Sequence, residues 1–144
     1  MNYYVYTDGA RSVERGVGSW AYLIYTDTHF IEWNFNKTVY ISSPTFAEDI
    51  AVGVACHSLL KQGLTKEDKV FFYSDSLATI KLLSSILDNN IEYTNKDVLI
   101  EDAVNMLRTL HEQTNIEFCK AHAHRNVLNP NICVDRMAKY VLRS

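Results

Sequence analysis

Residues 3–9 of the chain read YYVYTDG, and this stretch decides how the rest of the sequence is interpreted. Aromatic and β-branched residues are enriched in β-strands, whereas Asp-Gly is a common turn signal. The stretch therefore predicts a strand over residues 3–7 that ends in a turn at Asp8. A second stretch, FFYSDS over residues 71–76, predicts a buried strand over residues 70–73 that stops at Asp75. Each of these two strands is thus followed by an aspartate.

Two further strands are expected between these stretches, over residues 17–25 and 30–35. In the second of them Ile31, Trp33 and Phe35 alternate with polar residues, which is typical of a half-buried antiparallel strand. With residues 3–7, they form a three-stranded meander. The aromatic side chains on these strands are expected to pack in the core. They are Trp20, Tyr22, Trp33 and Phe35.

The remaining segments have helical spacing, apart from one short strand. Ser43-Pro44 is a good helix entrance and Gly63 a good terminator, so a helix is expected from residue 44 to about residue 61. Residues 76–87, 97–112 and 131–142 also predict helices, and residues 116–119 a strand. The order βββαβααβα predicts a single α/β domain over residues 1–144, with a mixed five-stranded sheet flanked by helices.

Bulk properties narrow the function classes. The chain has 144 residues, of which 47% are hydrophobic, and a net charge of −3. This charge argues against a protein that holds nucleic acid by bulk positive charge alone. Basic residues are nevertheless concentrated in residues 120–144, which are the expected contact for a phosphate backbone. No leader or membrane-spanning run is visible, and the cysteines (Cys56, Cys119, Cys133) are odd in number. We therefore expect a cytoplasmic protein with reduced, buried thiols.

Four acidic residues are the candidates for chemistry. Asp8 and Asp75 follow strands, and if these strands are parallel neighbours, both carboxylates reach one crevice. Glu48 and Asp135 lie early in two of the predicted helices. Four converging acids repel one another unless a cation offsets them, and Mg²⁺ takes oxygen ligands of this kind. Taken singly, each acid also has a structural explanation, as a turn residue, a helix cap or a partner of the helix dipole.

The motifs, taken together, resemble type 1 ribonuclease H over essentially the whole chain. YTDGA (6–10) is similar to the first strand of that family, and FAEDIAVGVACHSLL (46–60) to the helix with the catalytic glutamate. FFYSDS (71–76) is similar to the strand that ends in the second aspartate. KAHAH (120–124) and NICVDRMAK (131–139) resemble a loop with a mobile histidine and the helix with the last aspartate.

The resemblance implies a function and a set of roles. It implies that Asp8, Glu48, Asp75 and Asp135 bind two Mg²⁺ ions, with Mn²⁺ as a possible substitute. The reaction would be cleavage of the RNA strand of RNA/DNA hybrids to 5′-phosphate and 3′-hydroxyl ends. Asp49 would be a solvent-facing neighbour of Glu48. His122 would assist late cleavage and product release, with His124 as the rival for that role. Substrate contacts would come from Gly9, Ser12, Ser76, Lys120, His124 and Asn131.

The chain departs from the family at groove-contact positions, for example at Leu77, where glutamine is common. Residues 84–101 also lack a handle rich in lysine and tryptophan, which predicts weak, salt-sensitive binding unless a partner or another domain supplies affinity. We expect a monomer without an obligate protein partner. Two alternatives stay open: a nucleic-acid-binding module with weak or no activity, and a nuclease for another nucleic acid. A zinc site built from Cys119, His122, His124 and Cys133 is a further, less favoured interpretation because the spacing fits no familiar finger.

Overall fold

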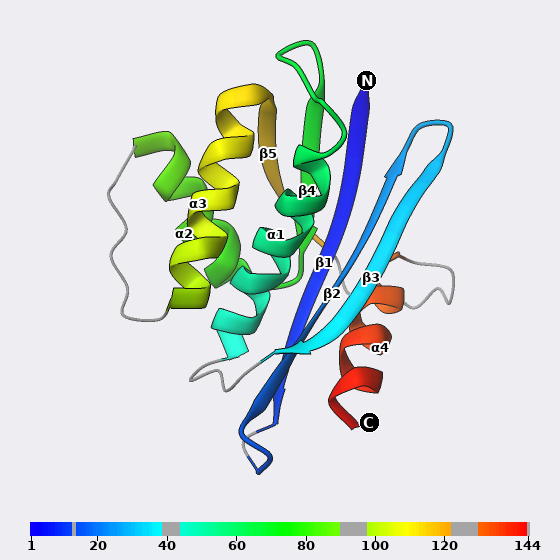
Figure 1. Cartoon of the computed structure of the whole chain (residues 1–144), viewed down its shortest axis with the longest axis vertical. Coiled ribbons are helices and arrows are strands. Elements are labelled where there is room, and N and C mark those ends of the chain that lie inside the picture. Colours follow the sequence, from blue (N-terminus) through cyan, green and yellow to red (C-terminus); the bar gives the residue numbers. More distant parts are fainter. Residues whose placement is uncertain (13, 39–43, 90–97, 122–129, 144) are drawn as a thin grey trace.

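The computed structural model describes residues 1–12, 14–38, 44–89, 98–121 and 130–143. Its sheet has the strand order β3-β2-β1-β4-β5 (Figure 1). The β1–β2 and β2–β3 pairs are antiparallel, whereas the β1–β4 and β4–β5 pairs are parallel. The predicted mixed sheet and the order βββαβααβα are confirmed. The elements are β1 (Asn2–Ser12), β2 (Val17–Thr26), β3 (Phe30–Thr38), α1 (Pro44–Leu60), β4 (Lys69–Ser74), α2 (Leu77–Asn89), α3 (Val98–Gln113), β5 (Asn115–Lys120) and α4 (Pro130–Arg143).

The first strand does not end at Asp8, and the predicted turn there is wrong. β1 stays paired with β2 as far as Ser12 opposite Val17, whereas its described pairing with β4 ends at Tyr6 opposite Tyr73. Asp8 therefore lies inside β1, just beyond the point where β1 and β4 part. The glycine that follows it serves close packing with helix α1 rather than a turn, as described below.

The helices cover the two faces of the sheet unequally. Figure 1 shows α1, α2 and α3 on one side and α4 on the other. Side chains that alternate along each strand divide between these layers, as the period of two requires. The larger core contains Val5, Ile24 and Phe72 from the sheet, together with Leu59 and Leu107 from the helices. A smaller cluster under α4 joins Ala21 of β2 to Val134 and Ala138.

Helices α1 and α3 approach each other closely at a pair of small residues. A Cβ atom added to Gly53 would lie 2.5 Å from the Cα of Ala103, so this crossing requires glycine. The predicted end of α1 is confirmed, because the helix stops at Leu60 and Gly63 adopts a φ of 68°. The helix that carries Glu48 is thus held firmly between the sheet and α3.

Three of the four strand aromatics pack as predicted. Tyr22 is buried, Trp20 packs against the larger core, and Phe35 packs against the cluster under α4. Trp33 is 52% exposed, so its predicted place in the core is wrong. β3 is an edge strand, and its Trp33 ring stacks on Phe35 at 5.5 Å without being covered itself.

The three cysteines are free, as expected, but they differ in burial. Cys56 is fully buried on α1, Cys119 is partly buried on β5, and Cys133 is exposed on α4. The prediction of buried thiols therefore fails for Cys133, because this residue lies on the side of α4 that faces away from the sheet. Among the residues that the structure describes, no helix is long and apolar enough to cross a membrane.

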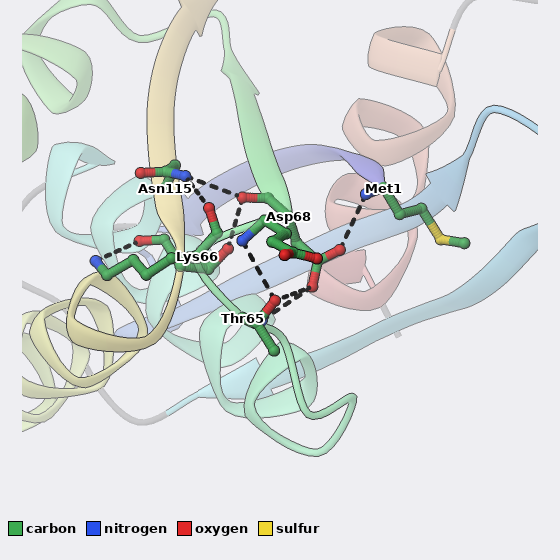
Figure 2. A network of polar contacts seen from close by, with 7 residues as sticks. Met1, Thr65, Lys66, Asp68 and Asn115 are labelled. Carbon is green, nitrogen blue, oxygen red and sulfur yellow. Dashed lines mark hydrogen bonds and ion pairs between the residues drawn. The ribbon is translucent and has the colours of Figure 1, made fainter.

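A polar network joins the starts of the three parallel strands (Figure 2). The ammonium group of Met1 donates to Oδ1 of Asp68 at 3.0 Å, and the backbone N–H of Thr65 donates to Oδ2 at 2.9 Å. Nδ2 of Asn115 donates to the carbonyl oxygen of Lys66 at 2.7 Å and to that of Asp68 at 3.3 Å. These contacts fix the register of β1, β4 and β5 at the end of the sheet that lies away from Asp8 and Asp75.

Candidate active site

Three of the four predicted acids meet at the opposite end of these strands. Asp8 of β1, Glu48 of α1 and Asp75, which follows β4, each offer one carboxylate oxygen, and these oxygens lie within 4.8 Å of one another. Asp8 is 3% exposed and Glu48 is 9% exposed, whereas Asp75 is exposed. The cluster therefore has a buried floor and one side open to solvent.

Gly9 makes this arrangement possible. A Cβ atom on Gly9 would lie 2.5 Å from the backbone nitrogen of Glu48, which is closer than any real side chain could come. The first turns of α1 can thus lie directly on β1, and Glu48 reaches the carboxylate of Asp8. The backbone N–H of Gly9 also donates to Oδ1 of Asp8 at 2.9 Å. Gly9, which is predicted to contact substrate, thus lies where the backbone of β1 packs against α1.

Burial raises the pKa of both buried acids, and neighbouring carboxylates add to the rise. For Asp8, burial is the main cause; its interaction with Glu48 lowers the pKa, and the charges of Asp75 and Asp135 raise it. For Glu48, burial is again the main cause, followed by the charge of Asp8. A buried pair of this kind holds a proton unless a cation offsets the two charges.

Asp135 is the fourth acid, and it approaches from the other face of the sheet. It is close enough to raise the pKa of Asp8, but it is not one of the three acids that lie within 4.8 Å of one another. Its Oδ2 forms an ion pair with Nζ of Lys139 at 3.2 Å. The hydroxyl of Ser19 donates to the carbonyl oxygen of Ala138 at 2.6 Å and so holds α4 against β2 near this acid.

Asp49 is not solvent-facing, and that prediction is wrong. Its side chain is 1% exposed, because α1 is enclosed by the sheet, by α3 and by α2. Burial raises the pKa of Asp49 to about 6, and the hydroxyl of Thr79 on α2 acts in the opposite direction. The sequence contains a signal for this burial: residues 50–56 of α1 are apolar on nearly every side, which is typical of a helix that is enclosed all round.

Comparison with known proteins identifies the family. The family model for ribonuclease H matches residues 1–143. The chain belongs to the ribonuclease H family. It is accordingly an enzyme that cleaves the RNA strand of RNA/DNA hybrids. No curated protein sequence shows significant similarity to it.

Solved structures support the fold of this ribonuclease H at low sequence identity. The N-terminal ribonuclease H domain of a Mycobacterium tuberculosis protein has a TM-score of 0.74 and 14% identity, covering 99% of this chain and 94% of that one. Ribonuclease H1 of Halobacterium salinarum has a TM-score of 0.68 and 16% identity, with 99% and 98% covered. LC11-RNase H1, in complex with an RNA/DNA hybrid, has a TM-score of 0.71 and 15% identity, with 98% and 96% covered.

Two predicted substrate contacts of this ribonuclease H support the loop that carries Asp75. The hydroxyl of Ser76 accepts the backbone N–H of Thr79 at 3.2 Å, so Ser76, and not Asp75, caps α2. The ammonium group of Lys120 donates to the backbone carbonyl of Asp75 at 2.5 Å and to that of Ala121 at 3.3 Å. Lys120 is still exposed, so it can both fix this loop and present charge to a phosphate. No sequence pattern predicted its contact with the Asp75 carbonyl.

The other predicted contacts lie in different places. Ser12 ends β1, and its hydroxyl accepts the backbone N–H of Arg15 at 3.3 Å within the β1–β2 turn. Asn131 is buried in the first turn of α4. His122 and His124 lie outside the described residues, and so does the choice between them. The zinc alternative, which needs both histidines, is likewise outside this part of the chain.

Proposed function

We propose that Asp8, Glu48, Asp75 and Asp135 together hold two divalent cations, Mg²⁺ with Mn²⁺ as a substitute, and that the RNA strand is hydrolysed at this site. The observation that carries the proposal is the convergence of three carboxylate oxygens within 4.8 Å from β1, from α1 and from the loop after β4. The expected products are a 5′-phosphate and a 3′-hydroxyl end.

The donor set fits a hard cation. All the candidate ligands are carboxylate oxygens, which Mg²⁺ and Mn²⁺ prefer. Oε2 of Glu48 is buried and has no hydrogen-bond partner among the described residues. An ionised carboxylate in that position needs a positive charge beside it, since burial alone keeps it protonated. A cation bound between Asp8, Glu48 and Asp75 would offset the repulsion that now raises the pKa of the two buried acids.

The scissile phosphate reaches the cluster of acids from the side that is open to solvent. Bound divalent cations would activate a water molecule and stabilise the leaving oxygen of the phosphodiester. Asp8 and Glu48 form the buried floor, so the RNA strand has to approach over Asp75 and Asp135. Lys120 holds the backbone of Asp75 in place as it does so. His122, or else His124, would assist the late stage of cleavage and the release of product.

The proposed partner of this site is an RNA/DNA hybrid, which the protein binds weakly. The protein is proposed to act as a monomer, with a single domain over residues 1–144. LC11-RNase H1, which shares the fold, has been crystallised with such a hybrid. Arg136 and Lys139 are exposed on α4 and support a contact with phosphates. The free thiols support a location in a reducing compartment such as the cytoplasm.

The deciding experiment measures cleavage of a labelled hybrid at low salt with Mg²⁺ and with Mn²⁺. Duplex RNA, duplex DNA and single strands serve as substrate controls. Asp75→Asn is expected to abolish cleavage, while the matched change Asp102→Asn, at an exposed acid on α3, leaves the rate unchanged. Full activity of Asp75→Asn would refute the site. A folded protein that binds hybrid and cuts none of the substrates would instead support the binding-module alternative.

A further inference from the structure

We propose that aromatic and basic side chains on β3 and α4 form a second nucleic-acid contact, which binds an unpaired extension of the RNA strand next to the hybrid. The inference rests on the proposed function and adds a feature of the substrate to it. We call this region the α4–β3 surface. Its side chains are Trp33, Phe35, Arg136, Lys139 and Tyr140.

The aromatic part of the α4–β3 surface is open to solvent at both ends. Trp33 is 52% exposed and Tyr140 is 68% exposed. Phe35 joins them, because its ring stacks on Trp33 with the centroids 5.5 Å apart and meets Tyr140 edge to face at 6.3 Å. Single exposed apolar residues are common on proteins, but a contiguous exposed patch of them marks a binding site.

Cations lie directly beside these rings. One surface hollow of about 430 Å³ on α4 is lined by Asp135, Arg136, Lys139 and Tyr140. Arg136 and Lys139 are exposed, and the ion pair of Lys139 with Asp135 is a surface pair of the kind that contributes little energy. Two cations against one acid leave the hollow positively charged, which suits a phosphate backbone.

The sheet places the rings in line with the metal site. Ala21 of β2 pairs with Asp8 on one side and with Phe35 on the other. α4 packs on Ala21 through Val134 and Ala138. The helix therefore lies between the metal site and the rings, and the direct path from one to the other crosses its outer surface.

The outer surface of α4 carries its side chains in the order that such a path requires. Successive residues of a helix are about 100° apart, so Lys139 and Arg136 lie between Asp135 and Tyr140 around the helix. The RNA strand is the one that is cleaved at the acids. An extension of this strand therefore leaves from Asp135, meets the two cations and then reaches the rings.

The mixture of rings and cations favours a single strand over a duplex or a protein. Bases in a duplex stack on one another, whereas unpaired bases stack on aromatic side chains while basic residues follow the backbone. Charged residues are depleted at the centre of protein interfaces, yet here two cations lie next to the rings. The α4–β3 surface thus has the composition of a site for single-stranded nucleic acid.

The test measures binding in EDTA, where metal-dependent cleavage does not occur. Fluorescence anisotropy compares a blunt RNA/DNA hybrid with the same hybrid carrying a short unpaired extension of the RNA strand, at either end, or of the DNA strand. An RNA extension should tighten binding about tenfold. Trp33→Leu combined with Tyr140→Leu should remove this gain. Trp33→Phe combined with Tyr140→Phe keeps both rings and should retain most of it.

Arg136→Gln separates the contribution of charge from that of stacking. It should weaken binding of the extended hybrid and lower the slope of log affinity against log salt by about 0.7, because one contact with a single-stranded phosphate is lost. Phe30→Leu is the matched control. Phe30 is 56% exposed at the start of β3, outside the α4–β3 surface, so the gain from the extension should persist.

Equal binding of blunt and extended hybrids by the wild type would overturn the proposal, and so would a gain that survives in the double leucine variant. A gain from the DNA extension alone would overturn the assignment to the RNA strand. Sedimentation tests the other occupant: self-association that the double leucine variant loses would make this surface an interface between copies of the chain and overturn the proposal. Failure of the proposed function has a different signature, because Asp75→Asn would then cleave like the wild type.

Discussion

Replacing Asp8 with asparagine should stabilise the metal-free protein while abolishing its activity. Burial raises the pKa of Asp8 from 3.8 to about 7, so Asp8 ionises less readily in the folded protein than in the unfolded chain. A carboxyl group whose pKa is raised on folding contributes stability below the unfolded pKa and loses it as the pH rises through the folded value. The wild type should therefore lose stability between about pH 4 and about pH 7.

The size of the effect follows from the same shift. A change of about 3 pKa units corresponds to roughly 4 kcal/mol, at about 1.36 kcal/mol per unit. This figure is an upper limit, because the replacing amide is itself polar and must be desolvated in the same place. We expect a net gain of about 1–3 kcal/mol at neutral pH, which raises the Tm by roughly 3–9 °C for a domain of this size.

The assay is thermal unfolding of both proteins in EDTA across pH 4 to 8, repeated at saturating Mg²⁺. The Tm advantage of Asp8→Asn should be near zero at pH 4 and should grow as the pH approaches neutrality. Saturating Mg²⁺ should stabilise the wild type, by about 2.7 kcal/mol at 100 times the Kd, and so reduce or reverse the difference. Asp102→Asn, at an exposed acid, should change stability by less than about 0.5 kcal/mol at every pH.

An Asp8→Asn variant that is less stable than the wild type at pH 7.5 in EDTA would contradict the cost assigned to the buried charge of Asp8. A stabilisation that does not vary with pH would be equally damaging, since it would point to improved packing and not to relief of a buried charge. Retention of hybrid cleavage by this variant would remove Asp8 from the catalytic site altogether.

Two further outcomes are expected. Gly9→Ala should abolish cleavage and lower the free energy of unfolding by about 1–3 kcal/mol, because a Cβ atom would press against the backbone of Glu48. Activity assays and chemical denaturation of the variant test this prediction. Wild-type activity and stability would show that α1 does not need this close approach. Asp68→Asn should lower the free energy of unfolding slightly at pH 6, by no more than about 1 kcal/mol, because Thr65 and the terminal ammonium of Met1 lower the pKa of Asp68. A group with a lowered pKa loses its contribution as the pH falls, so this difference should vanish in acid; a difference that persists there would contradict the assignment.

Much of this fold follows from local patterns. The period of two in residues 30–35 and the helical spacing after Pro44 depend only on neighbouring residues, so the elements and their order could be predicted. The four acids were singled out by their places beside predicted strands and helices and by the resemblance to ribonuclease H, and the structure brings Asp8, Glu48 and Asp75 together. The end of α1 before Gly63 was equally readable, because only glycine adopts its backbone conformation easily.

What a residue packs against was decided by the tertiary structure. Asp8-Gly9 has the composition of a turn, yet β1 continues through it because β2 pairs with it and α1 rests on Gly9. Trp33 is apolar but exposed, and it lies on the edge strand β3. Asp49 is charged in the sequence but buried, because α1 is enclosed by the sheet, by α3 and by α2. Sequence determines the preferences of each segment, whereas burial, register and the meeting of distant carboxylates depend on which elements share a surface, and only the folded chain brings those elements together.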